Sequence, residues 1–164
     1  MENNIAYLIK KTGELKEENP GKKFMQKIAY LIQAKGINLG LEYGMHFYGP
    51  YSAELDFCVV SLVAEGVAEF DYKGFSHLVG IVEGHDPECS FDDSALEIIE
   101  EVINRHKKDS PGDLELLTTT HYVKKNFKIG SDDDIIKGVI KIKGSKYTTE
   151  KITSAIKNLE QYTI

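Results

Sequence analysis

Apolar residues recur at steps of three and four along most of this 164-residue chain. The spacing is clearest in KKFMQKIAYLIQAK, residues 22–35, where Gly36 stands at the position that commonly ends a helix. The same spacing predicts helices over 4–16, 53–65, 94–107, 111–126 and 148–160, and a short helix that begins near Asp132. The expected structure is therefore mainly helical.

Side chains that cap helices mark several of the expected starts. Ser52 precedes one helix, and Ser110 precedes Pro111, a residue type favoured at the first helical position. Ser94 and Glu97 have the spacing of a capping box, which predicts that a helix opens at Ser94.

Two stretches between the third and fourth expected helices have the composition of β-strands. Residues 67–72 and 76–82 contain β-branched and aromatic residues, and they flank the turn-forming sequence KGF at 73–75. They predict an antiparallel hairpin. The segment 38–47 shows neither period, and we expect it to be extended or irregular.

The order of these elements predicts the fold class. Two helices, a short strand, a third helix and a hairpin are compatible with a winged-helix-like core over 20–83, and the helices of 94–164 would form a C-terminal helical layer. We therefore expect an α+β fold, mainly α, with a small β-hairpin, in a single domain over 1–164.

Net charge is −6, but the charged residues are unevenly distributed. Residues 1–39 carry seven lysines and four acidic residues, and residues 121–164 carry nine lysines and five acidic residues. The middle, residues 40–120, carries four basic and seventeen acidic residues. A protein that binds this middle is expected to be basic, and its association to weaken with salt.

A winged helix suggests DNA binding, which the charge pattern disfavours. The helix over 53–65 would be the recognition helix, yet it carries three acidic residues and no lysine or arginine. Phosphate neutralisation supplies most non-specific DNA affinity, so an acidic helix is repelled. The lysines of 22–35 are expected to form a solvated face. A regulator that binds DNA through its lysine-rich end helices stays open as an alternative.

Other classes of site have no support in the residue pattern. The chain has no CxxC or HxxxH spacing for a metal, no GxSxG motif and no glycine-rich phosphate loop. Cys58 lies on an apolar helical stripe and is expected to be an inert core residue. The chain shows no membrane-spanning run and no signal-peptide pattern. We therefore expect no catalytic residue, cofactor, metal or membrane contact, and a cytoplasmic location.

An aromatic cluster around Gly49-Pro50 is the strongest candidate for a site. Large rings with polar tips occur at binding surfaces and also at packed helix junctions, and the residues favour packing. His121 lies on the same helical face as Leu114 and Leu117, so it is expected to face the core. The candidate residues for an interaction surface or pocket are Tyr43, His46, Tyr48, Gly49, Pro50, Tyr51, Glu54 and His121.

Three segments resemble a known family: KKFMQKIAYLIQAKG, FYGPYSAELDFCVVSLVAEGV and LELLTTTHYVKK. They are similar to the YwgA-like family of uncharacterised bacterial and archaeal proteins, distant relatives of the SocA-like antitoxin domain called Panacea. The resemblance covers roughly 20–160 and differs from the antitoxin group at Tyr51, where that group more often has GPV. The signature positions are Lys23, Gln26, Lys27, Tyr48, Gly49, Pro50, Tyr51, Ser52, Leu55, Thr118 and His121.

The resemblance implies a mainly helical fold and a role in protein–protein interaction, as in antitoxins that bind a toxin or present it to a protease. It names no catalytic residue. We therefore expect a non-enzymatic interaction or regulatory domain with a protein partner; the residue pattern indicates no oligomeric state. A small-molecule binder or enzyme built on Tyr43, His46, Tyr48, Glu54 and His121 is the third hypothesis.

Overall fold

The computed structural model describes residues 1–74, 76–128 and 130–162, and these residues are mainly helical. The helices are α1 (Glu2–Lys16), α2 (Lys22–Ala34), α3 (Ala53–Ala64), α4 (Asp93–His106), α5 (Pro111–Asn126), α6 (Asp132–Lys143) and α7 (Thr149–Asn158), followed by a 3-10 turn over Leu159–Gln161. The strands are β1 (Gly44–His46), β2 (Gly49–Tyr51), β3 (Ala68–Lys73) and β4 (Ser76–Ile81). The expected α+β class, mainly α, is confirmed. No helix in the described ranges is long and apolar enough to cross a membrane.

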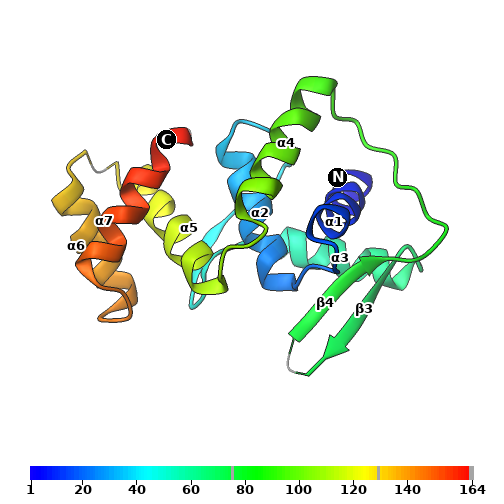
Figure 1. Ribbon diagram of the computed structural model, residues 1–164, viewed down its shortest axis with the longest axis horizontal. Helices are drawn as coiled ribbons and strands as arrows, with labels where there is room; N and C mark the ends of the chain where they lie inside the picture. Colours follow the sequence, from blue (N-terminus) through cyan, green and yellow to red (C-terminus); the bar gives the residue numbers. More distant parts are fainter. Residues whose placement is uncertain (75, 129, 163–164) are drawn as a thin grey trace.

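The helices form two groups that meet at α5, as Figure 1 shows. In one group α2 packs against α4, and α1 packs against α3, α4 and β4. In the other group α6 and α7 pack against α5 and against each other. Because α5 also contacts α2 and β2, it joins the two groups.

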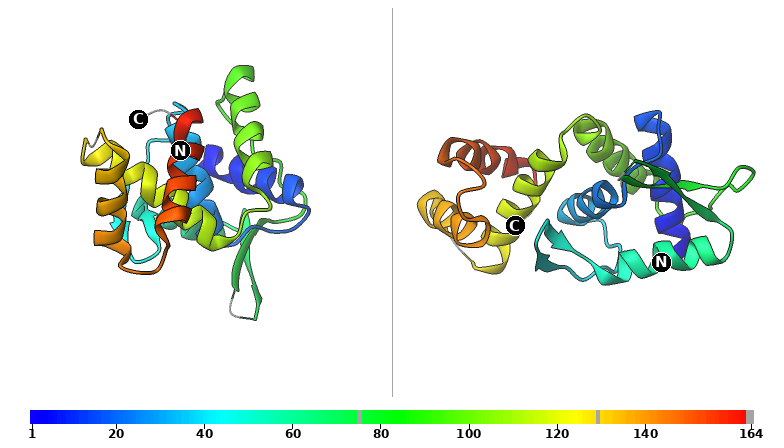
Figure 2. Two further views of the ribbon diagram at one scale, coloured as in Figure 1. Left: turned by 60° about the vertical axis from the view of Figure 1, so that its left-hand side comes forward. Right: turned by 90° about the horizontal axis from the view of Figure 1, so that it is seen from below.

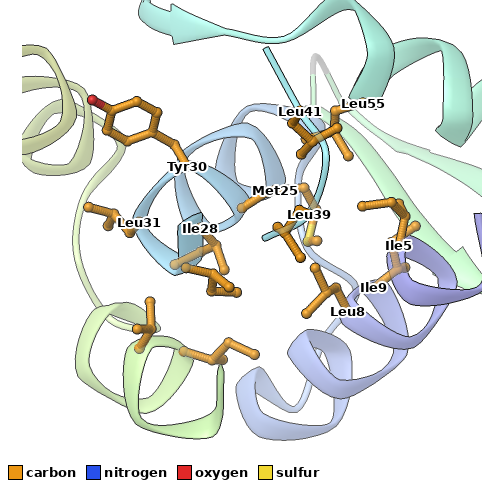
Figure 3. Close-up of a cluster of buried hydrophobic side chains, with 14 of the residues drawn as sticks. Ile5, Leu8, Ile9, Met25, Ile28, Tyr30, Leu31, Leu39, Leu41 and Leu55 are labelled. Atoms are coloured by element: carbon orange, nitrogen blue, oxygen red, sulfur yellow. The ribbon is translucent and has the colours of Figure 1, made fainter. Parts of the chain in front are cut away.

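Two clusters of buried apolar side chains hold these groups together. In the larger cluster, Leu8 of α1, Met25 of α2 and Leu39 lie together (Figure 3). The smaller cluster lies between α5, α6 and α7 and consists of Leu116, Val123, Ile135, Val139, Ile152, Ala155 and Ile156. Since α5 gives Leu114 to the first cluster and Leu116 to the second, its position is set from both sides.

Two of the expected caps are present, and one is wrong. Ser52 caps α3 by accepting the backbone N–H of Leu55 at 3.4 Å, and Ser110 caps α5. The capping box expected at Ser94 does not form, because α4 begins earlier and the Asp92 carboxylate accepts the N–H of Ala95 at 2.8 Å. A carboxylate there bonds a free N–H and also complements the helix dipole, so it is favoured over a serine.

The segment expected to be extended or irregular over 38–47 contains the strand β1, which pairs with a second, equally short strand. β1 and β2 are antiparallel, with Gly44 opposite Tyr51 and His46 opposite Gly49, so the turn consists of 47–48. Each strand has three residues, too few for an alternating pattern to be read. Pro50 also argues against a strand in the sequence, but β2 is an edge strand of a two-stranded pair, where proline is tolerated.

The expected hairpin over 67–82 is confirmed. β3 and β4 are antiparallel, with Ala68 opposite Ile81 and Lys73 opposite Ser76. The turn expected at 73–75 includes Phe75, which lies outside the described residues.

Replacing Asp92 by alanine should lower the free energy of unfolding by about 1 kcal/mol, because the Ala95 N–H and the helix dipole lose their carboxylate. Ser94→Ala is the matched control and should change it by less than about 0.5 kcal/mol. Urea denaturation of both variants measures the difference. An equal or larger loss in Ser94→Ala would contradict this position of the cap.

Candidate functional site

The aromatic cluster of the sequence folds into the β1–β2 hairpin, whose second strand contacts α2 and α5. Gly49 and Pro50 are buried, whereas Phe47 and Tyr48 at the turn are 81% and 48% exposed. We call Phe47 and Tyr48 the hairpin tip. One half of the motif therefore packs inside the protein, and the other half faces solvent.

Two lysines with buried side chains hold the hairpin backbone, one at the tip and one in β2. Lys27 of α2 donates from Nζ to the carbonyl oxygen of Pro50 at 2.8 Å. Lys143 of α6 donates to the carbonyl oxygen of Phe47 at 2.6 Å. Lys27 is 6% exposed and the side chain of Lys143 is 5% exposed. Helices that are far apart in the sequence thus fix the same hairpin.

Glu115 of α5 neutralises part of this positive charge. Its carboxylate is 2.8 Å from Nζ of Lys143 and 2.9 Å from Nζ of Lys146, and the residue is buried. Burial alone would raise the pKa of this carboxyl, but the hydrogen bonds and charges of the two lysines outweigh it and lower the pKa. Glu115 is therefore a buried anion that ties α6 and the loop after it to α5.

Lys27 is the least compensated cation of this group. Burial lowers the pKa of its ammonium to about 8; the charge of Glu115 acts to raise it, and those of Lys143 and Lys23 lower it further. The contact with the Pro50 carbonyl is the hydrogen bond that holds it. The Lys27 ammonium group is thus buried where it donates a hydrogen bond to a backbone carbonyl.

Gly49 makes the close approach of the hairpin to α5 geometrically feasible. Its φ is +93°, a conformation that residues with a Cβ rarely adopt. A Cβ there would stand 3.0 Å from Oγ1 of Thr119 and 3.4 Å from Nζ of Lys27. The Thr119 hydroxyl is itself buried and has no hydrogen-bond partner within the described part of the chain. The hairpin backbone therefore lies directly on α5.

The exit from the hairpin into α3 is fixed by one amide side chain. Gln26 donates from Nε2 to the Ser52 carbonyl at 2.9 Å and accepts the Ser52 N–H at 2.9 Å. The Ser52 hydroxyl donates to Glu54 at 2.8 Å. Glu54, one of the candidate residues, thus takes part in the start of its own helix.

The other candidates on the hairpin lie at its surface. His46 is exposed, and its ring centroid lies 4.6 Å from that of the half-buried Tyr51. Lys23 places its ammonium 3.5 Å from the centroid of the Tyr48 ring, a cation–π contact. These residues form an aromatic surface and not an enclosed pocket.

Tyr43 and His121 lie apart from that surface, beside Tyr30. The Tyr30 hydroxyl and Nδ1 of His121 are 2.7 Å apart, and the Tyr30 and Tyr43 rings meet edge to face with centroids 5.0 Å apart. The three side chains line a cavity of about 160 Å³. The Tyr43 hydroxyl is buried and has no hydrogen-bond partner among the described residues; burial raises its pKa, so it stays neutral.

The buried cysteine of α3 is not an activated nucleophile. Burial raises the pKa of Cys58 to about 11, so its thiol is protonated at neutral pH, in agreement with the expected core position. No group of three or more His, Cys, Asp or Glu side chains in the described part of the chain is placed to hold a metal ion. The arrangement can hold a turn rigid and present aromatic rings.

No protein-family model matches this chain, and no curated protein matches it. Its function must therefore be argued from the geometry of the hairpin and its surroundings.

Sequence reasoning missed Glu115 and Lys143 and misplaced Lys27. The expectation of a solvated lysine face on the second helix is wrong for Lys27, which is 6% exposed. Glu115 stands between leucines in LELL, and an acidic residue on a buried face needs a cation; this signal was available. Which lysine supplies the cation depends on how α6 packs on α5, which no local pattern reveals.

Gly49→Ala should lower the free energy of unfolding by about 2 kcal/mol or more, because alanine is strained at positive φ and its methyl group meets Thr119. Gly44→Ala is the matched control on the paired strand, since a Cβ at Gly44 meets nothing within 4 Å. Chemical denaturation compares the two. Equal stability of both variants would show that the hairpin can move away from α5.

Lys27→Met should remove an unusual pH dependence of stability. The folded protein releases the Lys27 proton near pH 8, whereas the unfolded chain keeps it until its ordinary pKa of about 10.5. Between these values the unfolded state binds more protons, so the folded state gains stability as pH rises. Wild type should therefore gain about 2 kcal/mol relative to Lys27→Met between pH 7.5 and 9.5.

The measurement is the free energy of unfolding of both proteins across that pH range. Buried tyrosines such as Tyr30 have raised pKa values, and they favour the folded state less as pH rises above about 10. Stopping at pH 9.5 and subtracting the Lys27→Met curve removes their contribution. If the free energies of unfolding of wild type and Lys27→Met changed equally with pH, Lys27 would titrate as an exposed lysine.

Proposed function

We propose that this chain is a non-enzymatic protein-interaction domain with a regulatory role, and that the hairpin tip is part of its contact surface. One observation carries the proposal: two adjacent aromatic rings, Phe47 and Tyr48, are exposed at the tip of a hairpin whose backbone is held by Lys27 at Pro50 and by Lys143 at Phe47.

Exposed aromatic side chains on a fixed backbone are typical of the residues that dominate binding energy at protein–protein interfaces. A large ring removes much apolar area from water when a partner covers it, and few side-chain torsions are lost. The two rings contact each other edge to face, with centroids 4.9 Å apart, so they act as one unit. Because the turn is already held in place, binding does not have to order it.

The resemblance to YwgA-like proteins suggests a more specific form of this proposal. In that form the domain has a winged-helix-like fold and binds a protein toxin or a similar regulatory partner. The order α2, α3, β3, β4 fits such a fold.

The charge around the hairpin tip restricts its partner. Lys23 and Lys146 place their ammonium groups 3.5 and 6.0 Å from the Tyr48 ring centroid. A basic partner, expected from the acidic middle of the sequence, would be repelled at this point. A neutral or acidic contact fits the tip, and a basic contact has to lie elsewhere on the surface.

Binding of DNA through the lysines of α2 is a weaker candidate. Lys22 pairs with Asp56 at 2.7 Å and Lys35 with Glu101 at 3.4 Å, while Lys23 lies on Tyr48 and Lys27 is buried. A strip of lysines that are engaged within the chain offers little charge to phosphates.

Binding of a small molecule is favoured by one observation, the buried Tyr43 hydroxyl with no partner in the described residues beside the cavity that Tyr30 and His121 also line. The cavity of about 160 Å³ is smaller than most ligand sites, which span roughly 300–1,000 Å³. An ordered water also satisfies such a hydroxyl. Small-molecule binding beside Tyr43 therefore ranks second.

The double variant Phe47→Ala, Tyr48→Ala should lose its bound partner while the melting temperature changes by less than about 3 °C, because both rings are largely outside the core. Quantitative pull-down from extract of the source organism measures the loss. Phe127→Ala is the control, since Phe127 is also exposed, at 58%, but lies at the end of α5. A partner set that is the same for all three proteins would contradict the proposal.

A further inference from the structure

Helix α3 is apolar on two opposite faces. One face is buried in the larger core and carries Leu55, Cys58, Val59 and Leu62. The opposite face carries Ala53, Phe57, Val60 and Ala64, spaced by four, three and four residues. We call these last four residues the outward stripe. All four are exposed; Phe57 is 74% and Val60 is 48% exposed.

The outward stripe is unusual for a helix at the surface of a protein. Figure 2 shows α3 running along one edge of the molecule, where no other element of the described residues covers its outer side. A surface helix normally has polar residues opposite its buried face, and a helix that is apolar all round is normally covered on both sides. The pattern therefore points to a second layer that packs on α3.

The charges beside the stripe select the chemistry of that layer. Glu54 and Glu65 are exposed on one flank, and α3 has no lysine or arginine. On the other flank Asp56 is paired with Lys22 at 2.7 Å. The free charge along the stripe is thus negative.

Antiparallel pairing of the stripe with a second copy of this chain is disfavoured by charge. In a two-fold pair whose axis is perpendicular to α3, the two helices run antiparallel, so that Glu54 of one copy approaches Glu65 of the other. Carboxylates would face each other at both ends, and no cation on α3 relieves the repulsion.

We propose that the outward stripe of α3 binds an amphipathic helix of a partner protein that carries lysine or arginine beside its apolar residues. The twelve residues of α3 span about 18 Å at roughly 1.5 Å per residue, enough for about three turns of a partner helix. Apolar side chains at positions i, i+3 or i+4 and i+7 of that helix would meet Phe57 and Val60, and its basic side chains would reach Glu54 and Glu65. This surface uses residues other than the hairpin tip and goes beyond the function proposed above.

Selection from a displayed library of helical peptides tests the proposal without a known partner. Peptides are selected on wild type and counter-selected on Phe57→Ser, Val60→Ser, which keeps the net charge and removes the apolar stripe. The selected peptides should carry apolar residues at helical spacing with lysine or arginine beside them. Their affinity should fall at least tenfold in Phe57→Ser, Val60→Ser and stay unchanged in Phe127→Ser.

The charge is tested separately. Glu54→Gln, Glu65→Gln should weaken the selected peptides several-fold and reduce the effect of salt on binding. Selected peptides that are neutral or acidic beside their apolar residues would overturn the proposal, as would affinities that do not depend on Phe57 and Val60. A wild-type dimer in light scattering that Phe57→Ser, Val60→Ser makes monomeric would overturn it in favour of a second copy.

The same peptides separate this inference from the function proposed for the hairpin tip. Phe47→Ala, Tyr48→Ala should bind them as wild type does, because the tip is not part of the stripe. If no partner depends on the hairpin tip but the peptides still depend on the outward stripe, the function proposed for the tip is wrong and this inference stands. If the partner depends on the tip but the peptides do not depend on the stripe, this inference is wrong and the proposed function stands.

Discussion

The contact of the Gly49-Pro50 backbone with α5 is the constraint on which the arrangement of the other elements depends. Only a residue without a Cβ can come this close to Thr119 at a φ of +93°. At that distance the carbonyls next to the tip come within reach of Lys27 from α2 and Lys143 from α6. The two helix groups are thereby joined through one turn as well as through α5. The same packing sets the exposure of the hairpin tip and, through Ser52, the start of α3.

Local patterns account for what could be predicted of the fold. The helices appear where apolar spacing and caps coincide, as at Ser52 and Ser110, because both are properties of a few neighbouring residues. The start of α4 was misplaced because Asp92 and Ser94 both offer a cap within two residues of each other. A short strand before α3 was expected, but its pairing with β2 was missed, because three-residue strands carry no readable alternation and Pro50 argues against a strand.

The position of the candidate site in the sequence was predictable, but the side chains that hold it in place were not. The unusual density of rings around Gly49-Pro50 marked the segment, and the structure divides it into a buried half and an exposed half. The groups that hold it, Lys143 and Glu115, come from helices that pack together only through the smaller core. Their pairing depends on the fold as a whole, and a buried ion pair is visible in a sequence only as a charge in an apolar stretch.

The charge distribution along the sequence predicts a basic partner, whereas on the folded surface the local charge differs between the hairpin tip and α3. The acidic middle contains both the hairpin tip and α3. Lysines from the two ends of the chain fold onto the tip, whereas at α3 Lys22 pairs with Asp56 and the exposed Glu54 and Glu65 keep the local charge negative. Two exposed apolar surfaces therefore carry opposite local charge. A single partner of uniform charge would be attracted to one of them and repelled by the other. A partner that covers both must change sign along its own surface, and separate partners for the two surfaces need not compete.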